Sequence, residues 1–478
     1  MEMKIKKSNF SDWYNTITKD ARLCDLRYGI KGFVVFMPWA VMTMNRMFAM
    51  YEKEVESKGH VPAWFPALVP ENYFTKETEH VEGFVPECFW VTQAGLHKLE
   101  ERYAMRPTSE TAMYTMYALW IKGKADLPFK LYQRAQVWRY ETKATKPFIR
   151  SREFYWIEAH DCFATEEDAM KQVREDMEMA ENIIHNEYCI PFFFFKRPQW
   201  DKFAGAVDTY AADTLLPDGK ALQLPSTHML GQNFSKAFNI KFMDDDEKEK
   251  YVWQTCYGPA VSRIYAGLIA THGDDSGLVL PFKLAPIQII IVPIFKEDTK
   301  EKVTAKAKEI EKTLADYSVK VDLTEKSPGF KFNEWEMKGV PVRIEIGMRD
   351  IEKGAVTLAR RDTKEKVQVK PADLKKKIEE TAESIRKNLR QNADKWFAEK
   401  TSSAETIEEL GKQLENGGFI RVPFCTDELK GKECADVLKD KCQANMRGSL
   451  FGSEMKPKGK CIACGKKANI YLYAARQY

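Results

Sequence analysis

Two stretches in which polar and apolar residues alternate, 130–141 and 153–163, constrain the fold of this chain most strongly. A period of two is that of a β-strand, and the short segment between the stretches predicts that the two strands pair. The alternation predicts that five side chains point from the pair into one space: Arg139, Glu141, Trp156, Glu158 and His160. Such a set makes a poor core, so it predicts a functional site, with a solvated sheet face as the alternative.

The loop between the two strands is basic. It contains Lys143, Lys146, Arg150 and Arg152. A basic loop above a polar sheet suits a polyphosphate, because the planar guanidinium group of arginine can grip two phosphate oxygens at once. A loop tip that is merely solvated is the alternative interpretation.

The rest of the sequence predicts an α/β protein of several domains. Its 478 residues are too many for one ordinary core. Helices are predicted at 38–58, 165–187, 297–316 and 371–400. Near residues 285–286 the pattern changes to β-α-β, and the apolar run IQIIIVPI is typical of a buried parallel strand. We therefore expect three domains, at 1–285, 286–400 and 401–478.

The composition limits which cellular compartment and which partners are expected for the protein. A formal net charge of +4 neither requires nor excludes a nucleic-acid partner. The sequence contains no apolar run of the roughly 18 residues that a membrane-spanning helix needs, and the N-terminus carries no signal-peptide pattern. Five of the ten cysteines crowd into the last 54 residues, unlike the pattern of a disulfide-bonded secreted protein. We expect a cytoplasmic protein that does not contact a membrane.

The cysteine-rich tail predicts a zinc site. The segment CIACG has two residues between Cys461 and Cys464, which is a strong zinc-binding spacing. Cys425 offers a third ligand, and either Cys434 or Cys442 the fourth. Four thiolates would form a closed, structural site without an open position for catalysis.

Several segments, in order along the chain, resemble the motifs of class II aminoacyl-tRNA synthetases. The helix at 38–58 with FPALVP, which contains Pro66, resembles motif 1; WRYE with the basic loop and RSREF resembles motif 2. GDDSGLVLPFKLAP (273–286) resembles motif 3, a strand followed by a helix. RPTSET (106–111), STHMLGQNF (226–234) and PGFKFNEWEMKGVPVRIE (328–345) resemble the prolyl-tRNA synthetases, of the archaeal and eukaryotic type.

That resemblance implies a fold and an activity. The expected fold is a class II catalytic domain with an antiparallel sheet flanked by helices, an α/β anticodon-binding domain and a small α/β zinc-binding C-terminal domain. The implied activity is the ATP-dependent attachment of L-proline to tRNA(Pro) through prolyl-adenylate, by a homodimer whose interface is motif 1. A pocket sized for proline excludes large side chains better than small ones, so alanine and cysteine are expected to be misactivated. The segment 161–250 is too short for the large editing domain of many bacterial relatives, so no editing in cis is expected.

The resemblance also implies the ATP-binding residues. Arg139 would hold the α-phosphate and the substrate carboxylate, which makes it the catalytic residue. Glu141 would accept a hydrogen bond from adenine, and Arg150 and Arg152 would hold the outer phosphates, with Mg²⁺ bridging phosphate oxygens. The family's motif 3 presents an arginine to adenine and the γ-phosphate, and Lys283 stands at the aligned position. The other implied nucleotide contacts are Gln223, Ser226, His228 and Thr255.

The implied proline pocket must bind a secondary ammonium and a carboxylate and enclose an apolar ring. Thr108 and Glu110 would bind the ammonium, and Arg139 would bind the carboxylate. The walls and floor would come from Trp156, Glu158, His160, Phe203, Cys256 and Gly258.

In the second domain, the implied anticodon contacts combine arginines and carboxylates, which can both read guanine. They are Glu336, Arg343, Arg349 and Asp350, and Met348 stands where the family usually has proline. In the tail, the segment ECADVLKD favours Cys434 over Cys442 as the zinc ligand, and Tyr478 is expected to fold back toward the active site.

Two alternatives remain. One is a threonyl or glycyl synthetase of the same class, against which RPTSET and the cysteine-rich tail argue. The other is a synthetase-like protein that binds RNA without catalysis, and only Lys283 favours it.

Overall fold

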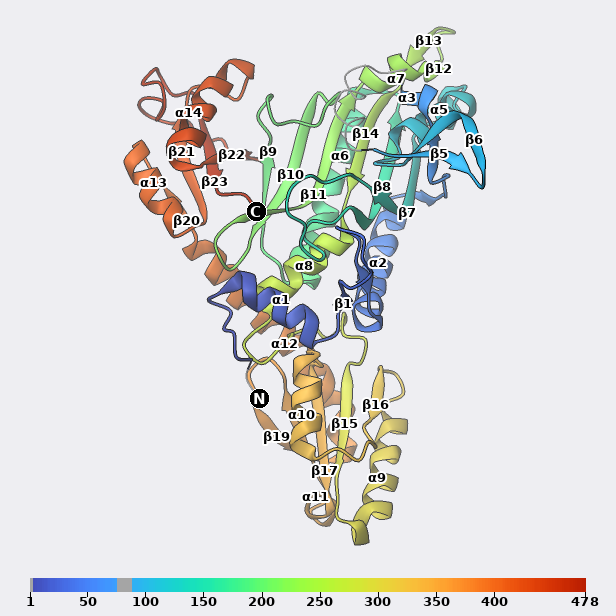
Figure 1. Cartoon of the computed structure of the whole chain (residues 1–478), viewed down its shortest axis with the longest axis vertical. Helices are drawn as coiled ribbons and strands as arrows, with labels where there is room; N and C mark the ends of the chain where they lie inside the picture. The colour runs from blue at the N-terminus through green and yellow to red at the C-terminus, as the bar shows by residue number, and fades with distance from the viewer. Residues whose placement is uncertain (1–2, 75–87) are drawn as a thin grey trace.

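The computed structural model describes residues 3–74 and 88–478. Its elements form three lobes (Figure 1): a large upper lobe around a broad sheet, a lower lobe, and an upper left lobe made by the last part of the chain. The long helix α12 (Leu374–Glu399) leads from the lower lobe back up to the last one.

One sheet organises the upper lobes. Its eleven strands follow the order β20 (Thr401–Ser403), β21 (Phe419–Phe424), β23 (Ile470–Ala475), β22 (Asn445–Leu450), β9 (Phe193–Lys196), β10 (Asp208–Leu215), β11 (Ala221–Gly231), β14 (Trp253–Gly258), β8 (Glu153–Phe163), β7 (Phe129–Trp138) and β3 (Val61–Pro62). Pairing is antiparallel except at the two edges, where β20 runs parallel to β21 and β3 to β7. The expected antiparallel sheet of a class II catalytic domain is confirmed.

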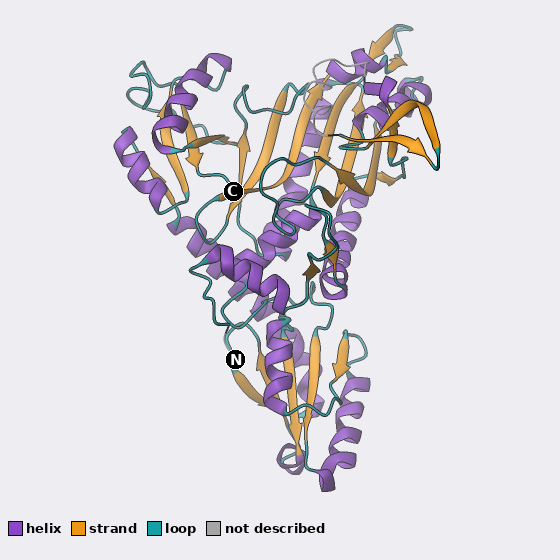
Figure 2. Ribbon diagram, in the orientation of Figure 1, coloured by secondary structure: helices purple, strands orange, loops and turns teal. Residues whose placement is uncertain are grey.

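Helices cover one face of this sheet, as Figure 2 shows. They are α2 (Pro38–Ser57), α6 (Glu166–Ala180) and α8 (Val261–His272), and α1 (Phe10–Asp20) packs near the end of α8. α6 begins as its sequence predicts, because the Thr165 side chain accepts a hydrogen bond from the Asp168 backbone at 3.1 Å. It continues as a π-helical segment, Glu181–Glu187. The largest fully buried side chains between these helices and the sheet include Trp13, Tyr14, Tyr51 and Tyr265.

A smaller subdomain lies beyond β7. It contains the three-stranded sheet β4 (Leu68–Pro70), β6 (His97–Met105) and β5 (Phe89–Ala94), together with α3 (Glu71–Phe74) and α5 (Glu110–Trp120). Beside it lie α7 (Asn233–Phe238) and the hairpin β12 (Lys241–Met243) and β13 (Glu249–Tyr251). A further short pair, β1 (Cys24–Asp25) and β2 (Val35–Phe36), precedes α2.

The lower lobe has the predicted β-α-β pattern. Its sheet runs β16 (Val319–Val321), β15 (Ile289–Ile294), β17 (Val342–Gly347), β18 (Val356–Arg360) and β19 (Lys366–Val369). The apolar run predicted as a buried parallel strand is β15, which is parallel to both of its neighbours. The helices are α9 (Lys300–Thr313), α10 (Pro328–Met337) and α11 (Met348–Glu352).

The last part of the chain does not form a sheet of its own. β22 pairs with β9 through Ser449↔Lys196 and Leu450↔Phe195, so the C-terminal strands extend the large sheet. The helices α13 (Ile407–Glu415) and α14 (Lys432–Cys442) pack against these strands. Across the described residues, no helix combines the length and the apolar character needed to cross a membrane.

Candidate active site

A cavity of about 270 Å³ opens on the sheet face opposite α6 and α8. Strands β8, β11 and β14 supply much of its floor, and the loops around them supply the rim. Every residue implied for the proline pocket lines this cavity: Thr108, Glu110, Arg139, Trp156, Glu158, His160, Phe203, Cys256 and Gly258. Besides Arg139, three of the implied nucleotide contacts line it too: Gln223, Ser226 and His228.

The acidic part of the cavity lies on β8 and at the start of α5. One polar atom each of Glu110, His160 and Cys256 lies within 4.8 Å of the others. Glu158 accepts hydrogen bonds from the Ser109 backbone at 3.1 Å and from Gln133 at 2.9 Å. The carboxylates of Glu110 and Glu158 therefore lie close together around the His160 imidazole, and negative groups of this kind favour a cationic amine as ligand.

The protonation of Glu158 and His160 follows from the groups around them. Burial opposes the charge on Glu158, but the hydrogen bond and the charge of His160 hold its pKa below the usual value. Burial likewise opposes the charge on His160, but the carboxylates of Glu110 and Glu158 raise its pKa. His160 Nε2 lies 3.3 Å from Glu158, and Nδ1 lies 3.0 Å from the Tyr114 hydroxyl. The imidazole is thereby fixed through both nitrogens.

The apolar wall of the cavity is tightly packed. The ring of Phe203 lies 4.7 Å from that of His228. Burial, with the charges of His160 and two arginines, lowers the pKa of His228 to about 3, so this imidazole is neutral. A Cβ atom at Gly258 would lie 3.2 Å from the Trp156 ring, so glycine lets the indole approach the floor closely.

The alternation predicted along β8 is confirmed, but the prediction for the preceding strand is wrong. β7 ends at Trp138, so Arg139 and Glu141 lie in the following loop instead of sharing a strand face. Arg139 donates to the Pro107 carbonyl at 3.0 Å, and its guanidinium lies 5.7 Å from the centre of the Trp156 ring. Glu141 is not among the residues that line the cavity. Its carboxylate accepts from the Lys143 backbone at 2.9 Å.

Thr255 was expected at the nucleotide, and the structure contradicts this. Its neighbour Cys256 faces the cavity, so alternation along β14 turns Thr255 to the opposite face. There its hydroxyl donates to buried Asp161 at 3.3 Å.

The assignment of motif 3 to residues 273–286 is also wrong. The only strands or helices adjoining that segment are α8 before it and β15 after it, and Lys283 sits in a turn. The Lys283 side chain is 61% exposed, pairs with Glu187 at 2.7 Å and does not line the cavity. The strand followed by a helix is β14 and α8, and it presents Arg263 to the cavity.

Arg263 was missed by the sequence reasoning. Its Nε donates to the Ile149 carbonyl at 3.1 Å. Burial, together with the charges of Arg139 and Arg150, lowers the pKa of its guanidinium to about 10. Cations held close together in this way favour an anionic ligand. The signal that could have identified Arg263 is its place near the start of an apolar helix directly after a strand.

Arg150 and Arg152 lie beside the cavity and do not line it. Arg150 Nη2 donates to the main-chain oxygen of Tyr478 at 2.6 Å. The tail therefore folds back to the basic loop, as expected of Tyr478. Arg152 Nε donates to the Glu141 carbonyl at 3.2 Å.

Comparison with known proteins agrees with this geometry. A family model of the tRNA synthetase class II core domain (G, H, P, S and T) matches residues 89–272, one of an anticodon-binding domain matches 288–381, and one of the prolyl-tRNA synthetase C-terminal region matches 407–478. The proline–tRNA ligase of Thermofilum pendens is 50% identical, over 99% of this chain and 98% of the relative. The chain belongs to the prolyl-tRNA synthetase family.

Other members agree over the full length. The proline–tRNA ligase of Pyrococcus abyssi is 43% identical, over 100% of both chains. A solved structure of Giardia lamblia prolyl-tRNA synthetase in complex with prolyl-adenylate superposes with a TM-score of 0.96 at 36% identity, covering 100% of both chains. The C-terminal family model and these names exclude the threonyl and glycyl alternatives as the family of this chain.

The residues implied for the anticodon form two groups in the lower lobe. Arg343 at the start of β17 donates to Glu336 on α10 at 2.8 Å. Arg349 and Asp350 lie on α11, after the end of β17, so about 13 Å of strand separates Arg343 from the start of α11. Asp350 caps α11 by accepting from the Gly347 backbone at 2.8 Å, and Arg349 is exposed.

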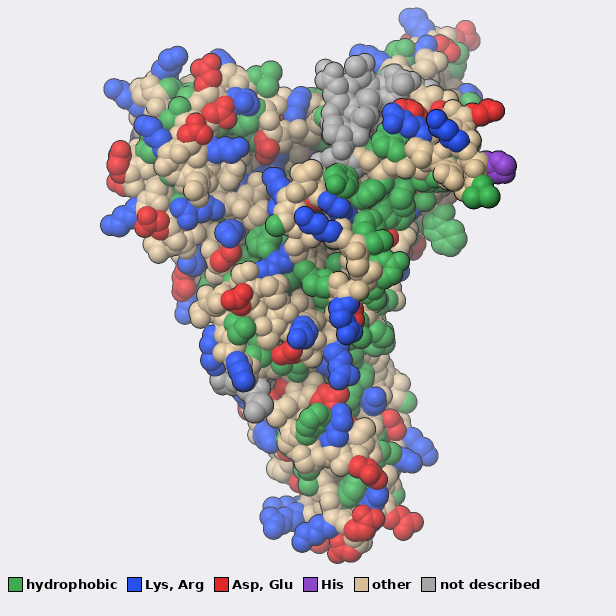
Figure 3. All heavy atoms as spheres, in the orientation of Figure 1, with side chains coloured by type: hydrophobic (Ala, Val, Ile, Leu, Met, Phe, Trp, Pro, Cys, Tyr) green, Lys and Arg blue, Asp and Glu red, His purple; other side chains and the backbone are tan. Residues whose placement is uncertain are grey.

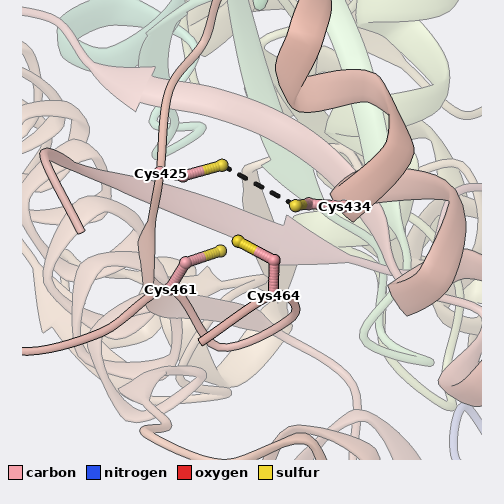
Figure 4. A group of neighbouring side chains, drawn as sticks. All are labelled: Cys425, Cys434, Cys461 and Cys464. Carbon is pink, nitrogen blue, oxygen red and sulfur yellow. Dashed lines mark hydrogen bonds between the residues drawn. The ribbon is translucent and has the colours of Figure 1, made fainter. Parts of the chain in front are cut away.

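The structure brings together four cysteines of the tail. Their sulfurs all lie within 4.8 Å of one another, and Figure 4 shows Cys425, Cys434, Cys461 and Cys464 pointing toward a common centre. The sulfurs of Cys425 and Cys434 are 3.7 Å apart. Cys442 lies elsewhere, with its sulfur 3.0 Å from the Leu438 carbonyl. The donor set and its compactness fit a tetrahedral Zn²⁺ ion, and the choice of Cys434 over Cys442 agrees with it.

Proposed function

We propose that the protein attaches L-proline to tRNA(Pro) in two ATP-dependent steps, through prolyl-adenylate. The observation that carries the proposal is the cavity itself, in which an acidic pocket for an amine adjoins a pair of arginines suited to phosphate. In the first step a carboxylate oxygen of proline attacks the α-phosphorus of ATP, and pyrophosphate leaves. In the second, a terminal ribose hydroxyl of the tRNA attacks the acyl carbon, and AMP leaves.

The residues of the pocket divide this work. Thr108, Glu110 and Glu158 bind the secondary ammonium, and Trp156 and Phe203 enclose the ring. Neutral His228 completes the wall without repelling the ammonium, since its pKa of about 3 keeps it uncharged at neutral pH. The chemistry itself needs positioning more than covalent help from the protein.

Arginines supply the electrostatic part. Arg139 lies between the acidic pocket and Arg263, where it stabilises negative charge on the α-phosphate and the carboxylate. Arg263 takes the place at adenine and the outer phosphates that Lys283 was expected to hold. Gln223 and Ser226 bind the ribose side. ATP enters with Mg²⁺, which neutralises phosphate oxygens when bound. Glu141, Arg150 and Arg152 lie beside the cavity, close enough for the charges of Glu141 and Arg150 to act on Arg263, and would contact the nucleotide from there.

The same proposal covers the other domains. Residues 1–285 form the catalytic domain, 286–400 the anticodon-binding domain with its connecting helix, and 401–478 the zinc-binding domain, in line with the three family matches. Arg343 with Glu336, and Arg349 with Asp350, read the anticodon of tRNA(Pro). Zn²⁺ held by the four converging cysteines has a structural role, because all four positions of a tetrahedral ion are then filled.

We further propose a cytoplasmic homodimer. Among the described residues no two cysteines form a disulfide, which supports a reducing compartment. Near the predicted motif 1, Trp64 is 90% exposed, and Val61 and Leu68 are also exposed. In Figure 3 hydrophobic side chains gather along the right-hand side of the molecule, near α2. An apolar surface of this kind supports a subunit interface.

Amino-acid-dependent exchange between ATP and pyrophosphate, measured with each of the twenty amino acids, tests the proposal. Exchange with proline, and weakly with alanine or cysteine, is the expected result. Exchange with threonine or glycine in place of proline would contradict the substrate, and no exchange with any amino acid would indicate an RNA-binding protein without catalysis.

A further inference from the structure

A side chain of the C-terminal segment reaches into the catalytic cavity. Arg447 lies on β22, is only 3% exposed, and lines the cavity together with Gln477 from the end of the chain. Close contact between β22 and β9 makes this possible. Gly448 has φ +123, and a Cβ atom there would lie 2.0 Å from the Lys196 carbonyl oxygen. The backbone crossing therefore requires glycine directly after Arg447.

Arg447 shares a buried carboxylate with a second arginine. Asp213 on β10 is fully buried and accepts from Arg447 Nε at 2.8 Å and from Nη2 at 3.0 Å. Arg197, after β9, donates to the same carboxylate twice, each time at 2.8 Å. Two parallel hydrogen bonds from each guanidinium fix the positions of all three groups, because a bidentate pair restricts direction as well as distance.

This triad contacts the nucleotide side of the cavity. Arg197 Nη2 donates to the amide oxygen of Gln223 at 3.2 Å. Gln223 lies directly opposite Asp213 in the pairing of β10 with β11. Since its oxygen accepts from an arginine, Gln223, which lines the cavity, offers a ligand there its amide nitrogen as a donor. The carboxylate keeps Arg197 in place, and Arg447 keeps the carboxylate in place.

We propose that Arg447 is a positioning residue for ATP, acting through Asp213 and Arg197 on Gln223. The C-terminal segment thereby completes the nucleotide side of the active site. This inference rests on the proposed function, in which Gln223 binds the ribose side of ATP. Arg447 itself need not touch the substrate.

The variant Arg447→Met tests the inference, with Arg421→Met as its matched control. Arg421 lies in the same segment, on β21, and packs on Tyr471 outside the cavity, with 4.7 Å between guanidinium and ring centre. Steady-state exchange should give a KM for ATP raised about tenfold in Arg447→Met, because small displacements of positioning groups have effects of this size or larger. The KM for proline should change less than about threefold. Arg421→Met should match the unmodified protein in both.

A second pair of variants separates positioning from folding. Arg447→Lys keeps the charge but loses the fork, so it should melt near the temperature of the unmodified protein and still show a raised KM for ATP. In the double variant Arg447→Met with Gln223→Met, the rise in the KM for ATP should be close to that of Gln223→Met alone, because both substitutions act on one contact.

Equal effects on both KM values, additive losses in the double variant, or a lowered melting temperature with an unchanged KM for ATP would each overturn the role of Arg447. Failure of the proposed function is distinguishable, because the unmodified protein would then show no exchange with proline.

Discussion

Arg263 offers the sharpest test of the nucleotide site. Within the described part of the chain, its guanidinium makes one hydrogen bond to the protein, to the Ile149 carbonyl at 3.1 Å, and the like charges of Arg139 and Arg150 act on it. An arginine in this position costs stability in the empty protein and gains its partner only when an anion binds. The variant Arg263→Gln removes the charge and keeps a donor for Ile149. We expect opposite effects on stability and on ATP binding.

The magnitudes follow from the environment. Burial and repulsion lower the pKa of Arg263 from its ordinary value to about 10, and each pKa unit corresponds to about 1.4 kcal/mol. Arginine is charged at pH 7 in both folded and unfolded chains, so a lowered pKa in the fold means that the charge destabilises the fold at pH 7. Water in the cavity screens much of this cost, because the side chain is only half-buried. Arg263→Gln should therefore raise the free energy of unfolding by about 0–1 kcal/mol.

ATP binding should change in the opposite direction. A hydrogen bond between charged groups is worth about 1.5–3 kcal/mol, so loss of the guanidinium should raise the KM for ATP by about 10- to 100-fold. The KM for proline should stay nearly constant, because Arg263 does not belong to the acidic pocket. ATP–pyrophosphate exchange at saturating proline measures the first effect, and denaturant unfolding without substrates measures the second.

Lys283→Gln is the matched control for this test. Lys283 is exposed and pairs with Glu187 on the surface, so its loss should leave both KM values unchanged and alter stability by no more than about 1 kcal/mol. The reasoning is refuted if Lys283→Gln raises the KM for ATP and Arg263→Gln does not. It is also refuted if Arg263→Gln destabilises the empty protein by about 2 kcal/mol without affecting ATP.

Three further predictions concern other parts of the molecule. Purified protein should contain about one zinc per chain, and Cys434→Ser should lose it while Cys442→Ser keeps it; equal metal content in the two variants would contradict the ligand set. Gly258→Ala should raise the KM for proline several-fold and leave that for ATP unchanged, because the new Cβ would lie 3.2 Å from the Trp156 ring and push it into the pocket. Burial and the charge of Asp161 raise the pKa of Asp176 to about 7, above its ordinary 3.8, so its stabilising contribution is complete below about pH 4 and is lost as pH rises to about 7. Asp176→Asn should flatten this part of the unfolding free energy between about pH 4 and 7, and an unchanged slope would contradict the raised pKa.

Local periodicity predicted the part of the site that one strand carries. Trp156, Glu158 and His160 face one cavity because they alternate along β8, and that alternation is visible in the sequence. The same rule, applied to β14, would have excluded Thr255 once Cys256 was placed in the pocket. The end of β7 at Trp138 could not be predicted in this way, because Arg139 and Glu141 continue the pattern of alternation into a loop.

The wrong assignment of motif 3 to residues 273–286 has a different cause. The segment 278–285 is apolar enough to suggest a strand, but its residues pack as a turn-rich connection between α8 and the lower lobe. Strand β14 and helix α8 precede it, and they bring Arg263 to the cavity. A search for a strand followed by a helix with an apolar face would have located Arg263. The glycine-rich start of the connection was the wrong starting point.

The contribution of the C-terminal segment was beyond sequence reasoning, since no local pattern records which strand becomes the neighbour of another. β22 pairs with β9, about 250 residues earlier in the chain, and without it β9 would be an edge strand with unpaired backbone groups. The same removal would uncover buried Phe195 and leave Asp213 with one arginine instead of two. A buried carboxylate that loses part of its pairing is costly, so the segment that carries the four cysteines cannot be separated from the catalytic sheet without disturbing the site that it completes.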